Sequence, residues 1–366
     1  MKCLKCGTNS LYRARSNGKC PQCGKRFVFE PKRGDPYTDG FFQAALTQIS
    51  AKQSLYFHPR HLYFELARRK KAKPLQNPKA AAIGTVVAGL IFGVIMSFPL
   101  ASFLGNAFFL VALVYLFILF RAAKKVISAA ESPEIQFKWL DFSKHLNRWK
   151  AVEGETIPYL LQTSDKPSKL IAAPPFKDLL DYSVERLILC DKPEIVDFLV
   201  ANQFHLEQKC AILSFNGYPR ENFEEIRAML QRSEHLMVYF IHNASLNGCS
   251  MVSELKRPEW FPHAKIFDLG LNPVHAEKFK GLWEKSNSPF RTLAGYSEEE
   301  LAWLKEWKLD LMVIPPSRLL RHLRNQINAH QEKIVDAYAA GDGVSDFGVE
   351  SGFVLDFDDG GGGDFG

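Results

Sequence analysis

The chain has 366 residues, of which 46% are hydrophobic and 23% are charged, and its formal net charge is +6. This ordinary globular composition leaves room for about two domains. The seven cysteines favour a reducing compartment with a metal site over a disulfide framework, and the basic, cysteine-rich N-terminus excludes a secretory signal. The positive excess lies mostly in the first 79 residues, whereas the tail after Lys333 is acidic.

Residues 1–30 contain the motif "CLKCGTNSLYRARSNGKCPQCGKRF", in which thirteen residues separate two C-x-x-C pairs. A C-x-x-C turn presents two thiolates from one tight loop, and Zn²⁺ prefers four such soft ligands in a tetrahedron. Gly7 and Gly24 follow the two pairs, where a free backbone lets amides point at the sulfurs. The pattern predicts a zinc ribbon that holds a structural Zn²⁺ ion through Cys3, Cys6, Cys20 and Cys23.

Two interpretations of the ribbon's role stay open. One is contact with nucleic acid through a basic surface. The other is a small metal-stapled module that docks on protein, since so short a segment cannot build a core without its metal. The basic residues that suit the first interpretation are Arg13, Arg15, Lys19, Lys25 and Arg26.

Residues 31–79 are predicted to form a basic, helical juxtamembrane segment, and residues 80–120 carry no charge at all. At about 1.5 Å per residue, this apolar run is too long for one crossing of a roughly 30 Å hydrocarbon layer and long enough for two. Pro99 and Gly105-Asn106 interrupt the run. The sequence therefore predicts a hairpin of two transmembrane helices, at about 80–98 and 103–120.

The flanks of this hairpin, "RRKKAKPLQNPK" and "RAAKK", are basic, and the connecting turn is uncharged. The positive-inside rule then places both flanks, and with them both termini, in the cytoplasm. Because the hairpin holds no ionisable residue, it is expected to anchor the protein in the lipid bilayer rather than to act as a transporter or a receptor. The basic flanks favour anionic headgroups.

After a linker and helical segment at 121–183, strand-like runs alternate with helical runs across residues 184–275. This order predicts an α/β domain with a mostly parallel sheet flanked by helices. Ligands in such sheets bind at the carboxyl ends of the strands, here the loops after Cys190, Phe215 and Ile241. We expect strands at 186–190, 210–215, 236–241 and 264–270, helices at 192–204 and 219–232, and a turn at Asn247-Gly248.

In this segment "LILCDKPEIVDFL", "CAILSFNGYP", "LMVYFIHNASLNG" and "IFDLGLNP" follow one another. The series resembles the Toprim domain of type IIB topoisomerase A subunits and their meiotic double-strand-break relatives, in which an acidic trio holds Mg²⁺. The "GYP" at 217–219, Gly248 and the "LGLNP" at 269–273 keep the frame of that family. The resemblance covers about residues 184–275, a quarter of the chain, and implies a Toprim-like fold.

The chain departs from that family where the family binds its metal. Asp191 stands at the position of the glutamate that ends strand one, and Asn243 and Ser245 stand at the positions of two aspartates. Mg²⁺ is a hard cation that prefers carboxylate oxygens, so two neutral ligands in place of two anions weaken its binding. We therefore expect this domain to keep the Toprim-like fold but to have lost Mg²⁺ binding.

A second resemblance lies at 58–69, "HPRHLYFELARR", which is similar to the winged-helix segment that carries the tyrosine nucleophile of the same family. The alignment places Phe64 at the nucleophile position, and phenylalanine has no hydroxyl group that could attack a phosphate. Tyr63 is one residue earlier and faces another side of the helix. The alternative is an amphipathic helix that buries Leu62, Tyr63 and Leu66.

Several remaining acidic and imidazole side chains have simple structural explanations. His242 lies at the end of the third strand and could be catalytic, although a hydrogen-bonded structural histidine is the more common case. A rearranged metal site could recruit Glu194, Asp197 or Asp268, although solvated or capping roles explain them more simply.

Residues 276–340 are predicted to be a helical C-terminal extension. Ser297 and Glu300 form a capping box, and a second helix follows Pro316. Its basic face consists of Arg318, Arg321, His322 and Arg324. Residues 341–366 are acidic and glycine-rich and are predicted to be disordered.

These features predict a membrane-anchored, cytoplasm-facing binding or scaffold protein without catalytic activity, which contacts protein partners and nucleic acid. Two alternatives belong to other functional classes. One is a Mg²⁺-dependent nuclease that uses Asp191 with unconventional ligands, and the other is a membrane recruitment factor that binds soluble proteins through its acidic tail.

Overall fold

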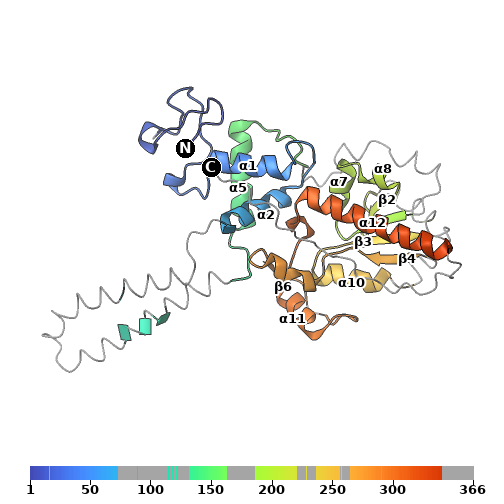
Figure 1. Ribbon diagram of the computed structural model, residues 1–366. Coiled ribbons are helices and arrows are strands. Elements are labelled where there is room, and N and C mark those ends of the chain that lie inside the picture. The colour runs from blue at the N-terminus through green and yellow to red at the C-terminus, as the bar shows by residue number, and fades with distance from the viewer. Residues whose placement is uncertain are drawn as a thin grey trace. The chain divides into compact units, whose positions relative to one another are not determined.

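The computed structural model describes residues 1–15, 17–72, 132–162, 186–220, 236–255, 264–289 and 291–339, together with single positions at 89, 114, 115, 117, 118, 120, 121, 228 and 257 (Figure 1). The chain divides into two compact units. The larger unit comprises residues 1–66, 137–279 and 284–366, and the smaller unit comprises residues 67–136 and 280–283.

The N-terminal part packs three helices around a cluster of aromatic rings. The helices are α1 (Asp39–Ile49), α2 (Pro59–Ala72) and α5 (Trp139–Glu153), preceded by the short 3-10 helices η1 (Tyr12–Arg15) and η2 (Pro31–Arg33). Phe29 follows the ribbon and is fully buried, with its ring 4.8 Å from Tyr37, 5.3 Å from Phe42 and 6.0 Å from Trp149. Offset and edge-to-face ring pairs of this kind stabilise a core beyond the area that they bury.

Four parallel strands form the central sheet, in the order β2-β1-β3-β4. Burial is nearly complete along β1, β2 and β3, as is typical of parallel strands covered on both faces, whereas the first two residues of the edge strand β4 are half-buried. The strands are β1 (Arg186–Cys190), β2 (Ala211–Ser214), β3 (Met237–Ile241) and β4 (Lys265–Asp268). The predicted α/β class, the parallel pairing and all four strand positions are confirmed.

Helices cover both faces of this sheet (Figure 1). On one face, side chains of α10 (Leu246–Leu255) pack on alternate residues of β1, β2 and β3. On the other face, α7 (Pro193–Ala201) contacts β1 and β2. There α12 (Pro316–Ala339) places the buried His330 ring 6.0 Å from Tyr239 and 4.4 Å from Phe267. The short helix α8 (Phe204–Gln208) follows α7.

The C-terminal extension is not purely helical. It contains η5 (Pro273–Phe279), α11 (Glu298–Glu306), η6 (Leu311–Val313) and α12, and also a small antiparallel pair of strands, β5 (Glu284–Lys285) and β6 (Trp307–Lys308). The capping box of Ser297 and Glu300 is confirmed, since both of its hydrogen bonds form at the start of α11. The helix predicted after Pro316 is α12.

Two other expectations from the sequence have different outcomes. The turn expected at Asn247-Gly248 is wrong, because both residues lie in the first turn of α10. The helix expected at 219–232 lies almost entirely outside the described residues, as do the hairpin at 80–120 and the tail at 341–366. Within the part of the chain that the structure describes, no helix has both the length and the apolar character needed to cross a membrane.

Candidate functional site

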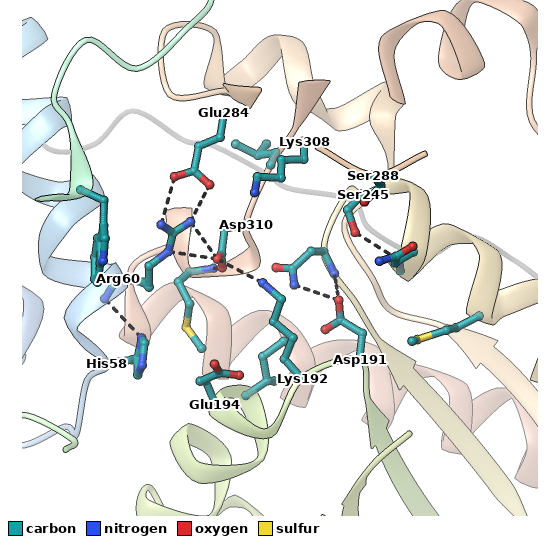
Figure 2. Close-up of a pocket in the computed structure, with 18 of the residues that line it drawn as sticks. His58, Arg60, Asp191, Lys192, Glu194, Ser245, Glu284, Ser288, Lys308 and Asp310 are labelled. Atoms are coloured by element: carbon teal, nitrogen blue, oxygen red, sulfur yellow. Dashed lines mark hydrogen bonds and ion pairs between the residues drawn. The ribbon is translucent and has the colours of Figure 1, made fainter. Parts of the chain in front are cut away.

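A cavity of about 780 Å³ opens at the carboxyl ends of β1, β2 and β3, and we call it the sheet-edge pocket (Figure 2). The loops after these three strands border it, as expected from the sequence. Segments distant in the chain complete its wall: the start of α2, the first residue of α5, and the β5 and β6 region. Its charged lining residues are Arg60, Lys192, Lys285 and Lys308, and Asp191, Glu194, Glu284 and Asp310.

Arg60 is held by two carboxylates on one side of the pocket. Its guanidinium donates to both oxygens of Glu284, at 3.0 and 2.6 Å, and to Oδ2 of Asp310 at 3.1 Å. Burial alone would lower the pKa of Arg60, but Asp310 and Glu284 outweigh it and raise the pKa. Two anions therefore neutralise this arginine inside the protein.

Asp310 connects Arg60 to a second cation. Its Oδ2 lies 3.7 Å from Nζ of Lys192, and its Oδ1 accepts from the backbone N–H of Met312 at the start of η6. Burial opposes ionisation of Asp310, yet Lys192 and Arg60 outweigh it and hold the pKa below its usual range. Figure 2 shows the resulting chain of charges from Glu284 through Arg60 and Asp310 to Lys192. Sequence reasoning missed Arg60, Glu284 and Asp310, because only the fold brings them together.

Asn243 occupies the centre of the predicted cation site, and both ends of its side-chain amide are engaged. Nδ2 donates to Oδ2 of Asp191 at 2.8 Å, and Oδ1 accepts from the backbone N–H of Leu311 at 2.6 Å. The backbone N–H of Asn243 also donates to Asp191, at 3.1 Å. Asn243 thus joins the end of β1 to the loop before α12, and both of its side-chain polar atoms have hydrogen-bond partners within the protein.

The other two residues of the predicted trio have different surroundings. Burial raises the pKa of Asp191, which is 6% exposed. Ser245 lines the pocket, and its Oγ accepts from the backbone N–H of Gly248 at 3.1 Å, so that it caps the first turn of α10. The structure therefore brings Asp191, Asn243 and Ser245 to one edge of the sheet, but it gives the amide and the hydroxyl structural partners.

His242 forms a buried ion pair beneath this edge. Its Nε2 lies 2.9 Å from Oδ1 of Asp268, and its Nδ1 lies 2.9 Å from the backbone oxygen of Asn243. Because both ring nitrogens face acceptors, both carry protons and the ring is cationic. Burial alone would lower the pKa of His242, but Asp268 raises it well above its usual range, and the pKa of Asp268 falls to about 2.

Gly248 and Gly270 leave room for this imidazole. A Cβ atom at Gly270 would lie 2.0 Å from the His242 ring, and one at Gly248 would lie 2.5 Å from the backbone oxygen of Asn243. No side chain fits at either distance. Packing therefore requires the glycines of "NASLNG" and "LGLNP" in this chain, because they leave space for His242, the residue that follows β3.

The aromatic residues of α2 are part of the core. Phe64, at the predicted nucleophile position, is fully buried, and Tyr63 is 1% exposed. The Tyr63 hydroxyl donates to the backbone oxygen of Phe137, and burial raises its pKa above the usual range. Neither side chain can attack a phosphate from this position. Of the remaining acidic candidates, Glu194 is exposed at the pocket and Asp197 accepts a hydrogen bond from the Tyr218 hydroxyl at 2.7 Å.

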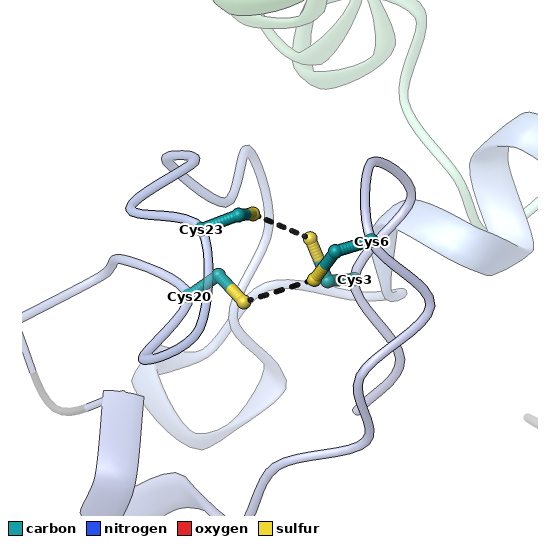
Figure 3. A group of neighbouring side chains, drawn as sticks. All are labelled: Cys3, Cys6, Cys20 and Cys23. Atoms are coloured by element: carbon teal, nitrogen blue, oxygen red, sulfur yellow. Dashed lines mark hydrogen bonds between the residues drawn. The ribbon is translucent and has the colours of Figure 1, made fainter.

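The four N-terminal cysteines converge on one point (Figure 3). Their sulfur atoms all lie within 4.8 Å of one another, with Cys3 to Cys23 at 3.7 Å and Cys6 to Cys20 at 3.6 Å. A tetrahedral ion with metal–sulfur bonds of about 2.3 Å requires sulfurs roughly 3.8 Å apart. The geometry of the thiols therefore fits a single metal ion.

The two halves of this cysteine cluster repeat one local structure. Gly7 donates its backbone N–H to Cys3 at 3.0 Å, and Gly24 donates to Cys20 at 2.9 Å. Both glycines have positive φ angles, 75° and 68°, which side-chain-bearing residues rarely adopt. The spacing in the sequence thus translates directly into two matching turns whose thiols face each other.

Two basic side chains of the ribbon pair with carboxylates of the protein itself. Arg15 is 7% exposed and its Nε donates to Oε2 of Glu30 at 2.7 Å, and Nζ of Lys25 lies 2.6 Å from Oε2 of Glu153 on α5. These two residues therefore do not belong to an open basic surface. Of the five basic residues named above for contact with nucleic acid, the other three, Arg13, Lys19 and Arg26, are exposed.

Comparisons of the chain with protein families, with characterised proteins and with solved structures gave no match. The resemblance to Toprim domains accordingly stays a prediction.

Proposed function

We propose that this chain is a membrane-anchored binding protein without catalytic activity, built from a zinc ribbon, a two-helix anchor and a Toprim-like domain that has no metal site. The observation that carries the proposal is the double engagement of the Asn243 amide between Asp191 and Leu311. A divalent ion that took the Asn243 amide as a ligand would compete with the hydrogen bonds to Asp191 and Leu311, and it would meet Lys192 next to Asp191.

The buried aromatic residues of α2 support the same conclusion independently. A phosphoryl-transfer enzyme of the resembling family needs a hydroxyl nucleophile that can reach its substrate. Phe64 has no hydroxyl, and that of Tyr63 is bonded within the core. Loss of both the nucleophile and the anionic ligands favours binding over catalysis.

Incubation of the purified full-length protein with DNA and Mg²⁺ or Mn²⁺ tests the absence of catalysis. We expect no cleavage, and the same result from Asp191→Ala and from a matched control, Asp141→Ala, whose carboxylate is exposed on α5. Metal-dependent cleavage that disappears in Asp191→Ala but persists in Asp141→Ala would establish the nuclease alternative instead.

The described positions of the proposed anchor support a lipid-facing role. The hydroxyl of Tyr115 donates to the backbone oxygen of Gly89 at 2.9 Å, which joins the two proposed helices. Val114, Phe117, Ile118 and Phe120 are each more than half exposed. Such apolar exposure is costly in water and favourable in hydrocarbon. We expect the protein to resist extraction from membranes by alkaline carbonate, and protease added from the cytoplasmic side to cut both termini.

Nucleic acid and soluble proteins are the two proposed classes of partner. For nucleic acid, Arg13, Lys19 and Arg26 remain exposed, and phosphate contacts by such residues make affinity fall with salt. We expect DNA binding that weakens between low and physiological salt and that is reduced by the triple substitution of these residues by serine. Absence of binding at every salt concentration would favour recruitment of proteins through the acidic tail.

A further inference from the structure

The sheet-edge pocket contains one buried acceptor without a donor. Asp191 accepts two hydrogen bonds on Oδ2 from Asn243, whereas its Oδ1 is buried and has no partner among the described residues. The residue is 6% exposed and lines the cavity. Buried polar atoms in folded proteins nearly always have a partner, so an exception beside a cavity marks a position where a water molecule or a ligand group can bind.

The same pocket contains one buried donor without an acceptor. Nδ1 of His58 accepts from the backbone N–H of Arg60 at 3.2 Å, so this nitrogen carries no proton in the neutral ring. Burial lowers the pKa of His58 to about 4, and the ring is neutral at physiological pH. Its proton therefore resides on Nε2, and within the described part of the chain no acceptor faces that atom.

Two charged side chains of the lining are likewise without an ion pair in the described structure. Glu194 is exposed at the start of α7, and Lys308 is half-buried on β6. The other lining cations each have a carboxylate partner: Arg60 has Glu284 and Asp310, Lys192 has Asp310, and Lys285 has Glu306. In the view of Figure 2, Glu194 and Lys308 lie on opposite sides of Asp310.

The unmatched groups form a balanced set. Asp191 Oδ1 and Glu194 need a donor or a positive charge, and His58 Nε2 and Lys308 need an acceptor or a negative charge. The lining as a whole has as many acidic as basic residues. A polyanion would leave the acidic groups unmatched and repelled, and a simple cation would do the same to the basic ones. A single molecule that carries both kinds of group can satisfy all four.

We propose that the sheet-edge pocket binds a small zwitterion, a molecule with an ammonium or amino group for Asp191 and Glu194 and a carboxylate or phosphate group for His58 and Lys308. The cavity of about 780 Å³ is within the usual range for small-molecule sites. The inference rests on the proposed function in one respect: the zwitterion would occupy the edge of the sheet where the proposed function places no metal ion.

Ligand-induced changes in melting temperature of the purified full-length protein test the inference, because a ligand that binds only the folded state raises its stability. The probes are the free proteinogenic amino acids and O-phosphoethanolamine, each at about 10 mM, well above the millimolar dissociation constants expected of such small ligands. Inorganic phosphate and ethylamine at the same concentration each supply only one of the two charges. We expect at least one zwitterion to raise the melting temperature, and neither single-charge probe to do so.

Two substitutions at the pocket and two matched controls connect any such effect to these residues. Glu194→Gln and Lys308→Met each remove one unpaired charge from a side chain that packing does not require, so both variants should fold. We expect each to weaken the affinity for the active zwitterion by at least about tenfold. Glu299→Gln and Lys305→Met change exposed residues of α11 that do not line the cavity, and they should leave the affinity unchanged.

Three outcomes would overturn the inference. The first is no effect from any zwitterion, the second is an equal effect from inorganic phosphate or ethylamine alone, and the third is an effect that survives both pocket substitutions. Each can occur while the DNA cleavage assay stays negative, in which case the proposed function stands and only the ligand class fails. Conversely, metal-dependent DNA cleavage with no zwitterion effect would overturn both.

Discussion

The cysteine cluster and the sheet-edge pocket differ in how their polar groups are matched. The cluster gathers four thiols within 4.8 Å of one another, a geometry that could hold a metal ion. The pocket gathers eight charged side chains and pairs four of them with one another, namely Arg60, Asp310, Lys192 and Glu284. We therefore propose that a metal ion completes the fold at the cysteine cluster, whereas the paired charges of the pocket neutralise one another.

The largest expected effect tests the dependence of the cluster on its ion. Cys20→Ser removes one of four ligands, and we expect the protein to lose its zinc and residues 1–30 to unfold, because structural zinc contributes about 10–16 kcal/mol to small domains of this kind. Elemental analysis and limited proteolysis measure both effects. Cys249→Ser, which removes a buried thiol of α10, should keep one zinc per chain. Full zinc retention in Cys20→Ser would contradict the assignment.

The next effect tests whether the pocket is neutralised from within. Asp310→Asn leaves Arg60 and Lys192 without their shared anion, and we expect a loss of about 2–4 kcal/mol in the free energy of unfolding. This is less than for a fully buried pair, since the Arg60 side chain is 18% exposed. Chemical denaturation measures the loss.

A surface ion pair provides the control for this substitution. Glu306→Gln breaks the ion pair with Lys285, in which the two side chains are 59% and 48% exposed, respectively. We expect this substitution to lower the free energy of unfolding by less than about 1 kcal/mol. Equal losses in the free energy of unfolding for Asp310→Asn and Glu306→Gln would show that the ion pairs around Arg60 stabilise the protein no more than a surface ion pair does.

A smaller effect reinstates an anion at the position where the resembling family has one. Asn243→Asp is nearly isosteric, but it removes the donor to Asp191 and places two carboxylates together. We expect a loss of about 1–3 kcal/mol at neutral pH, and a smaller loss near pH 4, where one carboxyl is protonated. Thermal unfolding with and without Mg²⁺ measures it, with the exposed Asn247→Asp as the control. Stability equal to that of the wild type at neutral pH would contradict the bonding assigned to Asn243.

The smallest effect concerns the pH dependence of the stability that the His242–Asp268 ion pair contributes. The pKa of His242 is raised in the folded state, so its contribution is complete below about pH 6.5 and decreases as the pH rises toward the folded value. The pKa of Asp268 is lowered to about 2, so its contribution is present above about pH 4 and is lost below. The stability difference between wild type and His242→Gln should therefore be largest between about pH 4 and 6.5, and decline by about 1 kcal/mol per pH unit above that range. A difference independent of pH from 4 to 9 would show that His242 is uncharged.

Much of the fold was predictable because its signals are local. The strand at 186–190 was placed to the residue, and the capping box of Ser297 and Glu300 identified the start of α11. Both follow from patterns within a few neighbouring residues. The turn expected at Asn247-Gly248 failed for the same reason: asparagine and glycine favour turns in isolation, but Gly248 is needed in α10 because any side chain would collide with Asn243 and His242.

The predicted site was found only in part. The sequence pointed to Asp191, Asn243 and Ser245 at one edge of the sheet, and they lie there. Neither composition nor spacing could reveal that Arg60, 250 residues before Asp310 in the chain, pairs with that aspartate, or that Leu311 takes up the Asn243 oxygen. The same holds for Arg15 and Lys25, which count as basic surface in the sequence but form ion pairs with Glu30 and Glu153.

The sequence by itself determined the cysteine cluster and the parallel sheet, because a C-x-x-C-G turn and an alternation of strands and helices carry their geometry within a short stretch of chain. Only the tertiary structure decided the chemistry of the sheet-edge pocket. A charge acts through its distance to other charges, and in this pocket the distances are set by segments from α2 to η6 that the fold brings together. That is why the neutral residues Asn243 and Ser245 at this edge could be identified from the sequence, whereas the cations and the unmatched groups around Asp191 could not.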